Sequence, residues 1–221
     1  KTTEFMKALG YGAKNTYNRY CFEESSPVSN LFLGLKYMID RDDKDKTSTY
    51  FEEINHYGSV TLLENTAYLP LGFLAEKDLA QLEFSESAGT FQFQNELFYA
   101  AAGVENVFHY LQGDSLSIIP NGLTITTKNS SGYCDYGECT AGSDVTYSYV
   151  ADRDGFLCIH LNLPKRNDFY VSVNGTELYK ETISLPQMLA VGDVKSGDVI
   201  DIRIECDKGE DSTMTVSAAI L

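Results

Sequence analysis

Three histidines, His56, His109 and His160, are the side chains of this 221-residue sequence best suited to general acid–base or metal chemistry. They lie some fifty residues apart, and none has a second ligand at a metal-binding spacing. The sequence has no Gly-x-Ser-x-Gly motif of a nucleophilic serine. Because an isolated histidine within strand-like sequence is usually structural, we assign no catalytic residue, no metal site and no cofactor.

An acidic run at residues 40–46, DRDDKDK, resembles a calcium loop at first sight. Counted from either Asp40 or Asp43, however, its sixth position has no glycine and its twelfth no glutamate. Interleaved basic residues also neutralise the run, so we interpret it as a solvated connection. Pairs of carboxylates suited to glycoside hydrolysis carry no information here, because 32 acidic residues would place such a pair in any fold.

Tyrosines in loop-like sequence are candidates for glycan contacts. The chain has 15 tyrosines and no tryptophan, and a tyrosine ring can stack on a sugar while its hydroxyl group stays in water. The alternative is that these rings only cover the edges of loops. The candidates are Tyr17, Tyr20, Tyr133 and Tyr136.

Five cysteines leave the redox chemistry open. Cys134 and Cys139 lie in the turn-rich sequence GYCDYGEC, where a disulfide is sterically plausible and would stabilise the fold by roughly 2 kcal/mol. Free thiols are the main alternative, since a structural zinc site needs four ligands and no histidine is near. Cys158 and Cys206 lie in apolar strand patterns and are interpreted as buried thiols.

Composition limits the classes of partner. The formal net charge is −15, which disfavours nucleic acid and anionic surfaces. Hydrophobic residues make up 43% and charged residues 22%, as in ordinary globular proteins. The sequence has no apolar run of the roughly 20 residues that a spanning helix needs. The chain starts at Lys1 without a signal-peptide pattern, so we expect an excised domain or a mature fragment.

The first half of the sequence predicts helices and strands together. Residues 2–10 read as a short helix with a hydroxyl cap and a glycine stop, and residues 11–26 as a loop. Apolar residues 33–39 and 60–64 are typical of strands. Residues 94–102, followed by Gly103, fit a second helix.

The second half has short strands at regular spacing, which is typical of a β-sandwich. Asn174-Gly175 predicts a type I′ hairpin. Residues 199–205 alternate with period two, and their even positions should point inward. We therefore predict an α+β fold: a small α+β portion over residues 1–108, then an antiparallel, jelly-roll-like β-sandwich over residues 109–221.

Four sequence segments also carry a resemblance to a known family. They are ENTAYLPLGF at residues 64–73, LGLKYMI at 33–39, FQFQN at 91–95 and DGFL at 154–157. In this order they resemble the ENxxALPxxF stretch, the Gly-hydrophobic-Lys-Tyr strand, the Gln-Asn helix start and the opening of the C-terminal sheet of YfhO-like bacterial polytopic membrane proteins. The matching residues are Gly34, Lys36, Tyr37, Glu64, Asn65, Pro70, Gly72, Phe73, Gln94, Asn95, Asp154 and Gly155.

The resemblance implies a function that could not be inferred from the residues alone. YfhO-like proteins are similar to glycosyltransferases that use lipid-linked sugars and add them to envelope polymers such as teichoic or lipoteichoic acid. The matching residues read as turns and strand starts, so no catalytic role is carried over to them. The expectation is an extracytoplasmic accessory domain, tethered to the membrane domain of the same polypeptide and facing an envelope glycan. A stand-alone carbohydrate-binding sandwich and a purely structural or assembly module are the alternatives.

Overall fold

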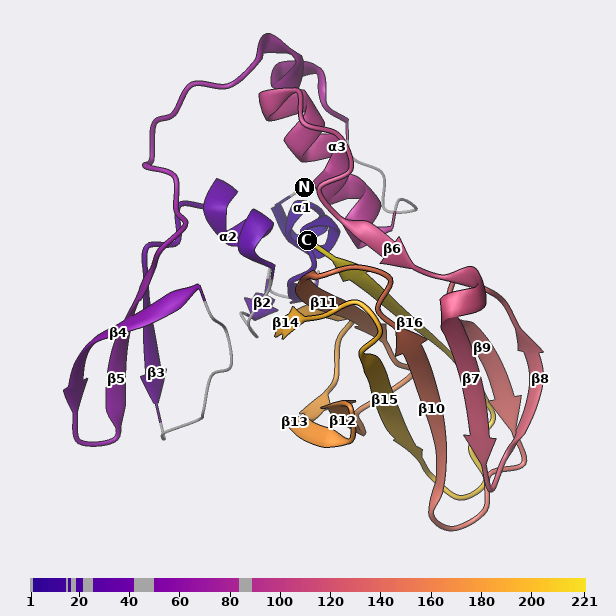
Figure 1. Ribbon diagram of the computed structural model, residues 1–221. Helices are drawn as coiled ribbons and strands as arrows, with labels where there is room; N and C mark the ends of the chain where they lie inside the picture. Colours follow the sequence, from indigo (N-terminus) through magenta and orange to yellow (C-terminus); the bar gives the residue numbers. More distant parts are fainter. Residues whose placement is uncertain (1, 15, 17–18, 22–25, 42–49, 84–88) are drawn as a thin grey trace.

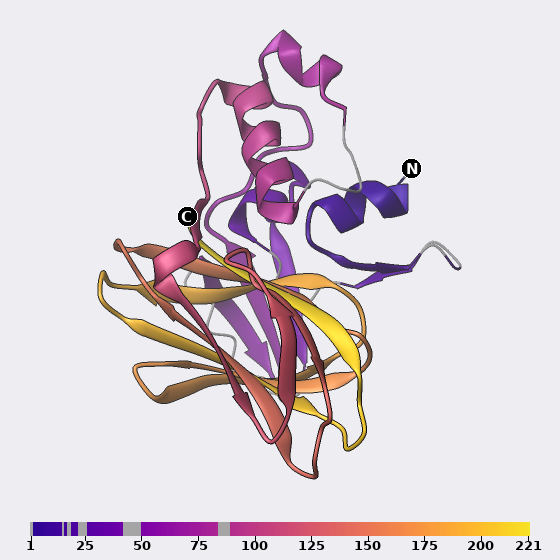
Figure 2. The same cartoon turned by 90° about the vertical axis from the view of Figure 1, so that its right-hand side faces the viewer.

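The computed structural model describes the chain except for residues 1, 15, 17–18, 22–25, 42–49 and 84–88. Figure 1 shows a β-sandwich built by the C-terminal half of the chain, next to helices and short strands from the N-terminal half. After a quarter turn, the helices lie above the sandwich (Figure 2).

The sandwich consists of two antiparallel sheets, and the chain crosses repeatedly from one to the other, as in a jelly roll. One sheet has the order β13-β12-β15-β10-β7; the other has the order β14-β11-β16-β9-β8, with β6 also paired to β16. The strands are β6 (His109–Leu111), β7 (Leu116–Asn121), β8 (Thr124–Lys128), β9 (Tyr133–Gly137), β10 (Ser143–Val150), β11 (Gly155–Asn162), β12 (Asn167–Val173), β13 (Thr176–Ile183), β14 (Gln187–Val194), β15 (Val199–Cys206) and β16 (Ser212–Ile220). The prediction of an antiparallel β-sandwich after a small α+β portion is confirmed.

The core of the sandwich follows from period-two alternation. On β15, Ile200, Ile202 and Ile204 have no exposed surface, whereas Asp201 and Arg203 between them are partly exposed. The prediction that the even positions of this strand point inward is therefore confirmed. The isoleucines belong to one buried cluster with side chains from both sheets, and this burial is the main source of stability for such a fold.

The hairpin between β12 and β13 also forms where the sequence predicts it. Asn174 and Gly175 have φ angles of +51° and +77°, as a type I′ turn requires. The side chain of Asn174 accepts a hydrogen bond from Val199 N at 2.9 Å, so the turn is joined to the start of β15.

The N-terminal part contains two small sheets, one of the order β1-β2 and one of the order β3-β5-β4. Its elements are α1 (Thr2–Ala8), β1 (Gly12–Lys14), β2 (Arg19–Cys21), α2 (Pro27–Phe32), β3 (Tyr37–Arg41), β4 (Phe51–Tyr57), β5 (Val60–Asn65), the 3-10 helix η2 (Lys77–Gln81) and α3 (Thr90–Ala102); a further 3-10 turn, η3 (Gly113–Ser115), precedes β7. Both predicted helices are present, although α3 starts four residues before the predicted position. Gly103 ends α3 in the left-handed conformation.

Two predictions about the early chain are wrong. The predicted strand at residues 33–39 is instead a turn directly after α2, a short connection and the start of β3, because Gly34 adopts φ +63°. Helix α2, which was not predicted, begins at Pro27. Ser26 caps it by accepting a hydrogen bond from Ser29 N at 3.2 Å, and Pro27 occupies its first turn. The predicted loop at residues 11–26 contains the short strands β1 and β2.

Two further details of the N-terminal part differ from expectation. The local sequence of residues 64–73, with Asn65 and Thr66 before Pro70, predicts a turn that leads into a strand. In the structure, β5 precedes the turn and no strand follows before η2. The strand β4 was not predicted, because its solvent-facing side chains give no apolar alternation. Most of the acidic run at residues 40–46 lies outside the described residues.

The two parts are joined by a second buried cluster on the outer face of the six-stranded sheet. Phe91 of α3 and Phe108 pack there against Cys158 of β11, Met188 of β14 and Ala219 of β16. Met188 also donates its backbone N–H to Gly10 O at 2.7 Å. The helices thus cover part of this sheet face and leave the rest uncovered.

Candidate functional site

A polar strip of the six-stranded sheet forms the floor of a cleft. His160 and Asn162 alternate along β11 with buried aliphatic residues, and Thr215 and Ser217 do the same along β16. In the antiparallel register, His160 pairs with Ser217 and Asn162 pairs with Thr215. The alternation therefore places an imidazole, an amide and two hydroxyl groups on one surface that faces away from the core.

The N-terminal part supplies most of the walls of this cleft, which has a volume of about 540 Å³. That size falls within the usual range for small-ligand sites, about 300–1,000 Å³. One wall comes from α1 and β1, and another from the start of α3 and the segment before β14. The residues that line the walls are Glu4, Lys7, Ala8, Ala13, Lys14, Gly89, Thr90, Phe91, Tyr110, Leu185 and Pro186.

Aromatic rings form one side of the cleft. The ring of Phe91 meets the ring of Tyr110 edge-on, with centroids 5.7 Å apart, and packs against Phe108 at 5.1 Å. Burial raises the pKa of the Tyr110 phenol, and a hydrogen bond from the backbone of Gln92 opposes that effect. The phenol therefore stays protonated at neutral pH and keeps a hydroxyl group at the cleft.

The charge of the cleft differs from that of the chain. Lys7 and Lys14 line it with a single acid, Glu4, in a chain of net charge −15. Burial lowers the pKa of His160 to about 4, so its ring is neutral at pH 7 and can both donate and accept a hydrogen bond. The cleft can therefore bind polyhydroxyl groups of neutral or negative charge.

Two residues of α3 hold the walls in place. Gln94, which is fully buried, donates from Nε2 to Leu9 O at 3.1 Å and contacts Met188 Sδ at 3.5 Å, and its Oε1 accepts from Ser26 Oγ. Asn95 bonds both backbone groups of Phe108, at 2.7 and 3.0 Å. These family-motif residues thus tie α1, α2 and the segment leading to β6 to a single helix.

Other family-motif residues gather at the three-stranded sheet. The ammonium of Lys36 lies 3.3 Å from the Glu64 carboxylate and about 5 Å from the rings of Tyr37 and Tyr68. These contacts, first that with Tyr37, raise the pKa of Lys36. Asn65 is buried; its side chain donates to Leu35 O at 2.9 Å and accepts from Ala67 N at 2.8 Å. The contacts of these motif residues hold the three-stranded sheet and its neighbouring turns together.

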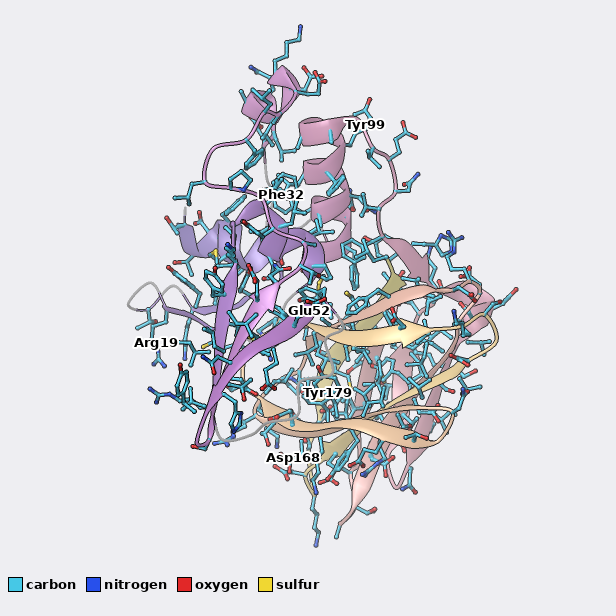
Figure 3. All side chains as sticks on the ribbon, turned by 60° about the vertical axis from the view of Figure 1, so that its left-hand side comes forward. Arg19, Phe32, Glu52, Tyr99, Asp168 and Tyr179 are labelled. Carbon is cyan, nitrogen blue, oxygen red and sulfur yellow. The ribbon has the colours of Figure 1, made fainter. Side chains whose placement is uncertain are left out.

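The remaining motif residues occupy turns. A side chain at Gly34 would meet Leu69 O at 3.1 Å, and one at Gly155 would overlap with Ile220. Asp154 accepts from Ser196 N at 2.9 Å. Pro70 and Gly72 lie exposed after β5. The ring of Phe73 packs edge-on against that of Phe32, with the ring centroids 6.0 Å apart. Figure 3 labels Phe32.

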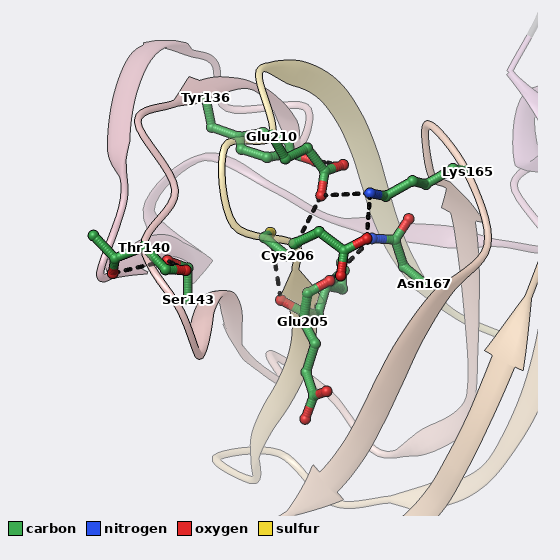
Figure 4. Close-up of polar contacts among 10 residues, drawn as sticks. Tyr136, Thr140, Ser143, Lys165, Asn167, Glu205, Cys206 and Glu210 are labelled. Carbon is green, nitrogen blue, oxygen red and sulfur yellow. Dashed lines mark hydrogen bonds and ion pairs between the residues drawn. The ribbon is translucent and has the colours of Figure 1, made fainter.

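The three candidate tyrosines that the structure describes do not form one site. Tyr17 lies outside the described residues, and Tyr20 is half exposed on β2. Tyr133 and Tyr136 lie on β9 rather than in a loop, which corrects the expectation. Tyr136 has no exposed surface, and its hydroxyl donates to Glu210 at 2.7 Å (Figure 4), so its ring cannot stack on a glycan.

The cysteine pair is also placed differently from the expectation. The side chain of Cys134 is buried in β9, whose residues Cys134 and Tyr136 alternate inward. Cys139 is buried beyond the end of this strand, and both residues are free thiols in the structure, so it contains no disulfide between them. Cys158 and Cys206 are buried in β11 and β15, as predicted.

None of the predicted site residues lines the cleft. The sequence analysis therefore did not predict the cleft. The available signal was the pair of polar alternations, His160 with Asn162 and Thr215 with Ser217, opposite fully apolar positions. Nothing in the sequence indicated that the two strands are neighbours or that α1 covers them. Among the described residues, no group of three or more His, Cys, Asp or Glu side chains is placed to hold a metal ion.

Residues 1–217 match the family model described as bacterial membrane protein YfhO. The chain therefore belongs to the YfhO family of bacterial membrane proteins. No curated protein sequence matches it. Within the described part of the chain, no helix is both long enough and apolar enough to cross a bilayer.

Several solved structures are similar to about half of this chain. A family 35 carbohydrate binding module from Clostridium thermocellum is 13% identical, with a TM-score of 0.34 over 51% of this chain and 96% of its own. A family 35 module from Cellvibrio japonicus is 16% identical, with a TM-score of 0.35 over 52% of this chain and 93% of its own. These values are too low to support any inference about function, and the fold assignment rests on the strand pairing described above.

Proposed function

We propose that this chain is an extracytoplasmic accessory domain of a YfhO-family membrane protein and that it holds a cell-envelope glycan in the cleft. The observation that carries the proposal is the cleft itself. Its floor presents Asn162, Thr215, Ser217 and neutral His160, and its side presents the Tyr110 ring. Hydroxyl, amide and ring groups on one concave surface are the chemistry that recognises sugars.

The class of glycan follows from the charges. Lys7 and Lys14 outnumber Glu4 at the cleft, so a phosphate-bearing polymer of the teichoic or lipoteichoic acid type is favoured over a basic one. The sugar-transfer reaction is assigned to the membrane domain of the same polypeptide, from a lipid-linked donor. In this proposal the domain binds and positions the acceptor and carries out no chemistry.

Calorimetric titration of the isolated chain with purified teichoic acid tests the binding step. The variant Thr215→Ala/Ser217→Ala removes two hydroxyl groups from the cleft floor and should weaken binding about tenfold, since each lost hydrogen bond is worth roughly 0.5–1.5 kcal/mol. The matched control is Thr146→Ala/Ser148→Ala, which removes the same two groups from β10 on the other sheet. Equal affinity of both variants would contradict the assignment of the cleft.

Deletion of this domain from the full-length protein tests the accessory role. Envelope glycosylation should be lost, and it should be reduced by the cleft variant in the same assay. Wild-type glycosylation after deletion would refute the accessory role. If the isolated chain shows no affinity for any glycan while deletion still abolishes activity, the domain has a structural or assembly function. Strong glycan binding without a role in glycosylation would instead favour a stand-alone carbohydrate-binding module.

A further inference from the structure

The segment between β5 and η2 exposes apolar side chains to an unusual degree. The side chains of Leu71 and Leu74 are fully exposed, and those of Tyr68 and Phe73 are more than one-third exposed. Residues 65–75 contain no charged residue, in a chain of which 22% is charged. Figure 1 shows this segment as the long purple trace that runs along the outside of the molecule, away from the sandwich. We call residues 67–75 the apolar loop.

The apolar loop is anchored to the N-terminal part at several points. Asn65, at the turn that starts the loop, donates from its side chain to Leu35 O before β3 and accepts from Ala67 N within the turn. Leu69 N donates to Leu31 O at 3.4 Å, and Phe73 packs edge-on against Phe32 of α2. Asn65 and Phe73 are family-motif positions, so part of the motif anchors a loop that directs Leu71 and Leu74 away from the protein.

The residues around the apolar loop indicate the chemistry of its binding partner. Next to Phe32 lies an entirely apolar hollow of about 240 Å³, lined also by Leu33, Leu79 and Leu82. The charged neighbours, Lys36 and Lys77 with Glu64, Glu76 and Asp78, sum to only −1, in contrast to −15 for the chain. Leucines, a tyrosine and lysines at their edge are the residues that lie stably at the boundary between lipid headgroups and acyl chains.

We propose that the apolar loop inserts into the headgroup region of a lipid bilayer and so orients this domain on the membrane surface. Membership of a membrane-protein family supplies the bilayer as a partner, and the small local charge suits zwitterionic lipids. Burial of apolar side chains drives the insertion. The proposal does not depend on glycan binding, because the loop and the cleft share no residue.

The absence of tryptophan from the sequence permits a direct test. In Leu71→Trp the only tryptophan lies on the apolar loop, and with phosphatidylcholine vesicles its emission should shift to the blue and be quenched by lipids brominated in the acyl chain. Ile119→Trp, at an exposed position of β7, is the control and should change neither signal. An unchanged spectrum for the loop variant would overturn the proposal, and docking of the loop on protein would then be the alternative.

Vesicle co-sedimentation of the unlabelled chain provides a second test. Leu71→Ser/Leu74→Ser should lower the partition coefficient about tenfold or more, because each leucine contributes well over one power of ten when fully buried. Ile119→Ser/Val150→Ser removes two exposed apolar residues from the sandwich at constant charge and should leave binding unchanged. Equal loss in both pairs would mean that the binding is non-specific and would also overturn the proposal.

Discussion

In the sandwich, the fully buried residues are mainly aliphatic and come from alternate positions of paired strands, whereas most buried polar residues lie in the N-terminal part. That part has a small apolar cluster of its own, centred on Leu9, Phe93 and Leu97. Its elements are connected by side-chain amides such as Asn65, Gln94 and Asn95. The sandwich is therefore held mainly by hydrophobic burial, and the N-terminal part depends on specific hydrogen bonds.

This difference bears on function, because the cleft lies where the two parts meet. Its floor belongs to the sandwich, and most of its wall residues belong to the part that depends on hydrogen bonds. A change in one buried amide should therefore alter the walls while leaving the floor intact. Substitutions in each part can separate these two sources of stability.

The largest effect is expected in the sandwich core. Ile202→Ala should lower the free energy of unfolding by about 2–5 kcal/mol, because it removes a side chain with no exposed surface and leaves a cavity. Urea denaturation followed by circular dichroism measures the loss. Val199→Ala on the same strand, at a more exposed position, should cost less than about 1 kcal/mol. Similar losses for both would contradict a core dominated by burial.

A smaller and more local effect is expected at Gln94. Gln94→Ala leaves the buried Leu9 carbonyl and Ser26 hydroxyl without this partner and should cost about 1–3 kcal/mol. Hydrogen exchange should accelerate in α1 and α3 but not in β10 or β15. Gln92→Ala is the control, since Gln92 is exposed on the same helix and its side chain donates to Glu96 on the helix surface. Uniform acceleration across the sandwich would show that the two parts unfold together.

The pH dependence of stability should depend on His160. Its pKa is lowered to about 4 in the folded chain from 6.5, so between these values the unfolded chain binds more protons. Stability should therefore be fully present above about pH 6.5 and fall by about 1–3 kcal/mol as the pH decreases towards 4. Thermal denaturation across this range measures the slope. His160→Gln should flatten it; an unchanged slope would assign the effect to other groups.

The smallest effect is expected at the hairpin turn. Gly175→Ala should cost about 1 kcal/mol, because an alanine is strained at φ +77°. Gly72→Ala in the apolar loop has no left-handed backbone to maintain and no atom within 4 Å of the new methyl group, so it should be neutral or slightly stabilising. The melting temperatures of the two variants measure this difference. A greater loss of stability in Gly72→Ala than in Gly175→Ala would contradict the prediction.

The sequence by itself determined what depends on neighbours along the chain. The alternation of Ile200, Ile202 and Ile204, the Asn174-Gly175 turn and the glycine stop at Gly103 are local patterns with one stable solution each. They were sufficient to predict β15, the hairpin of β12 and β13 and the end of α3, and the regular spacing of short strands predicted the sandwich. The family motif was also visible in the sequence, although its role as an anchored loop was not.

The tertiary structure decided what depends on strands and helices far apart in the chain. His160 and Ser217 become neighbours only through the register of β11 with β16, and Lys7 reaches them only because Gln94 and Met188 fix α1 over the sheet. Burial likewise separates Tyr136 from the exposed tyrosines that it resembles in sequence. Non-local pairing and solvent exposure are properties of the packed chain, since the same short sequence can lie in a core or on a surface.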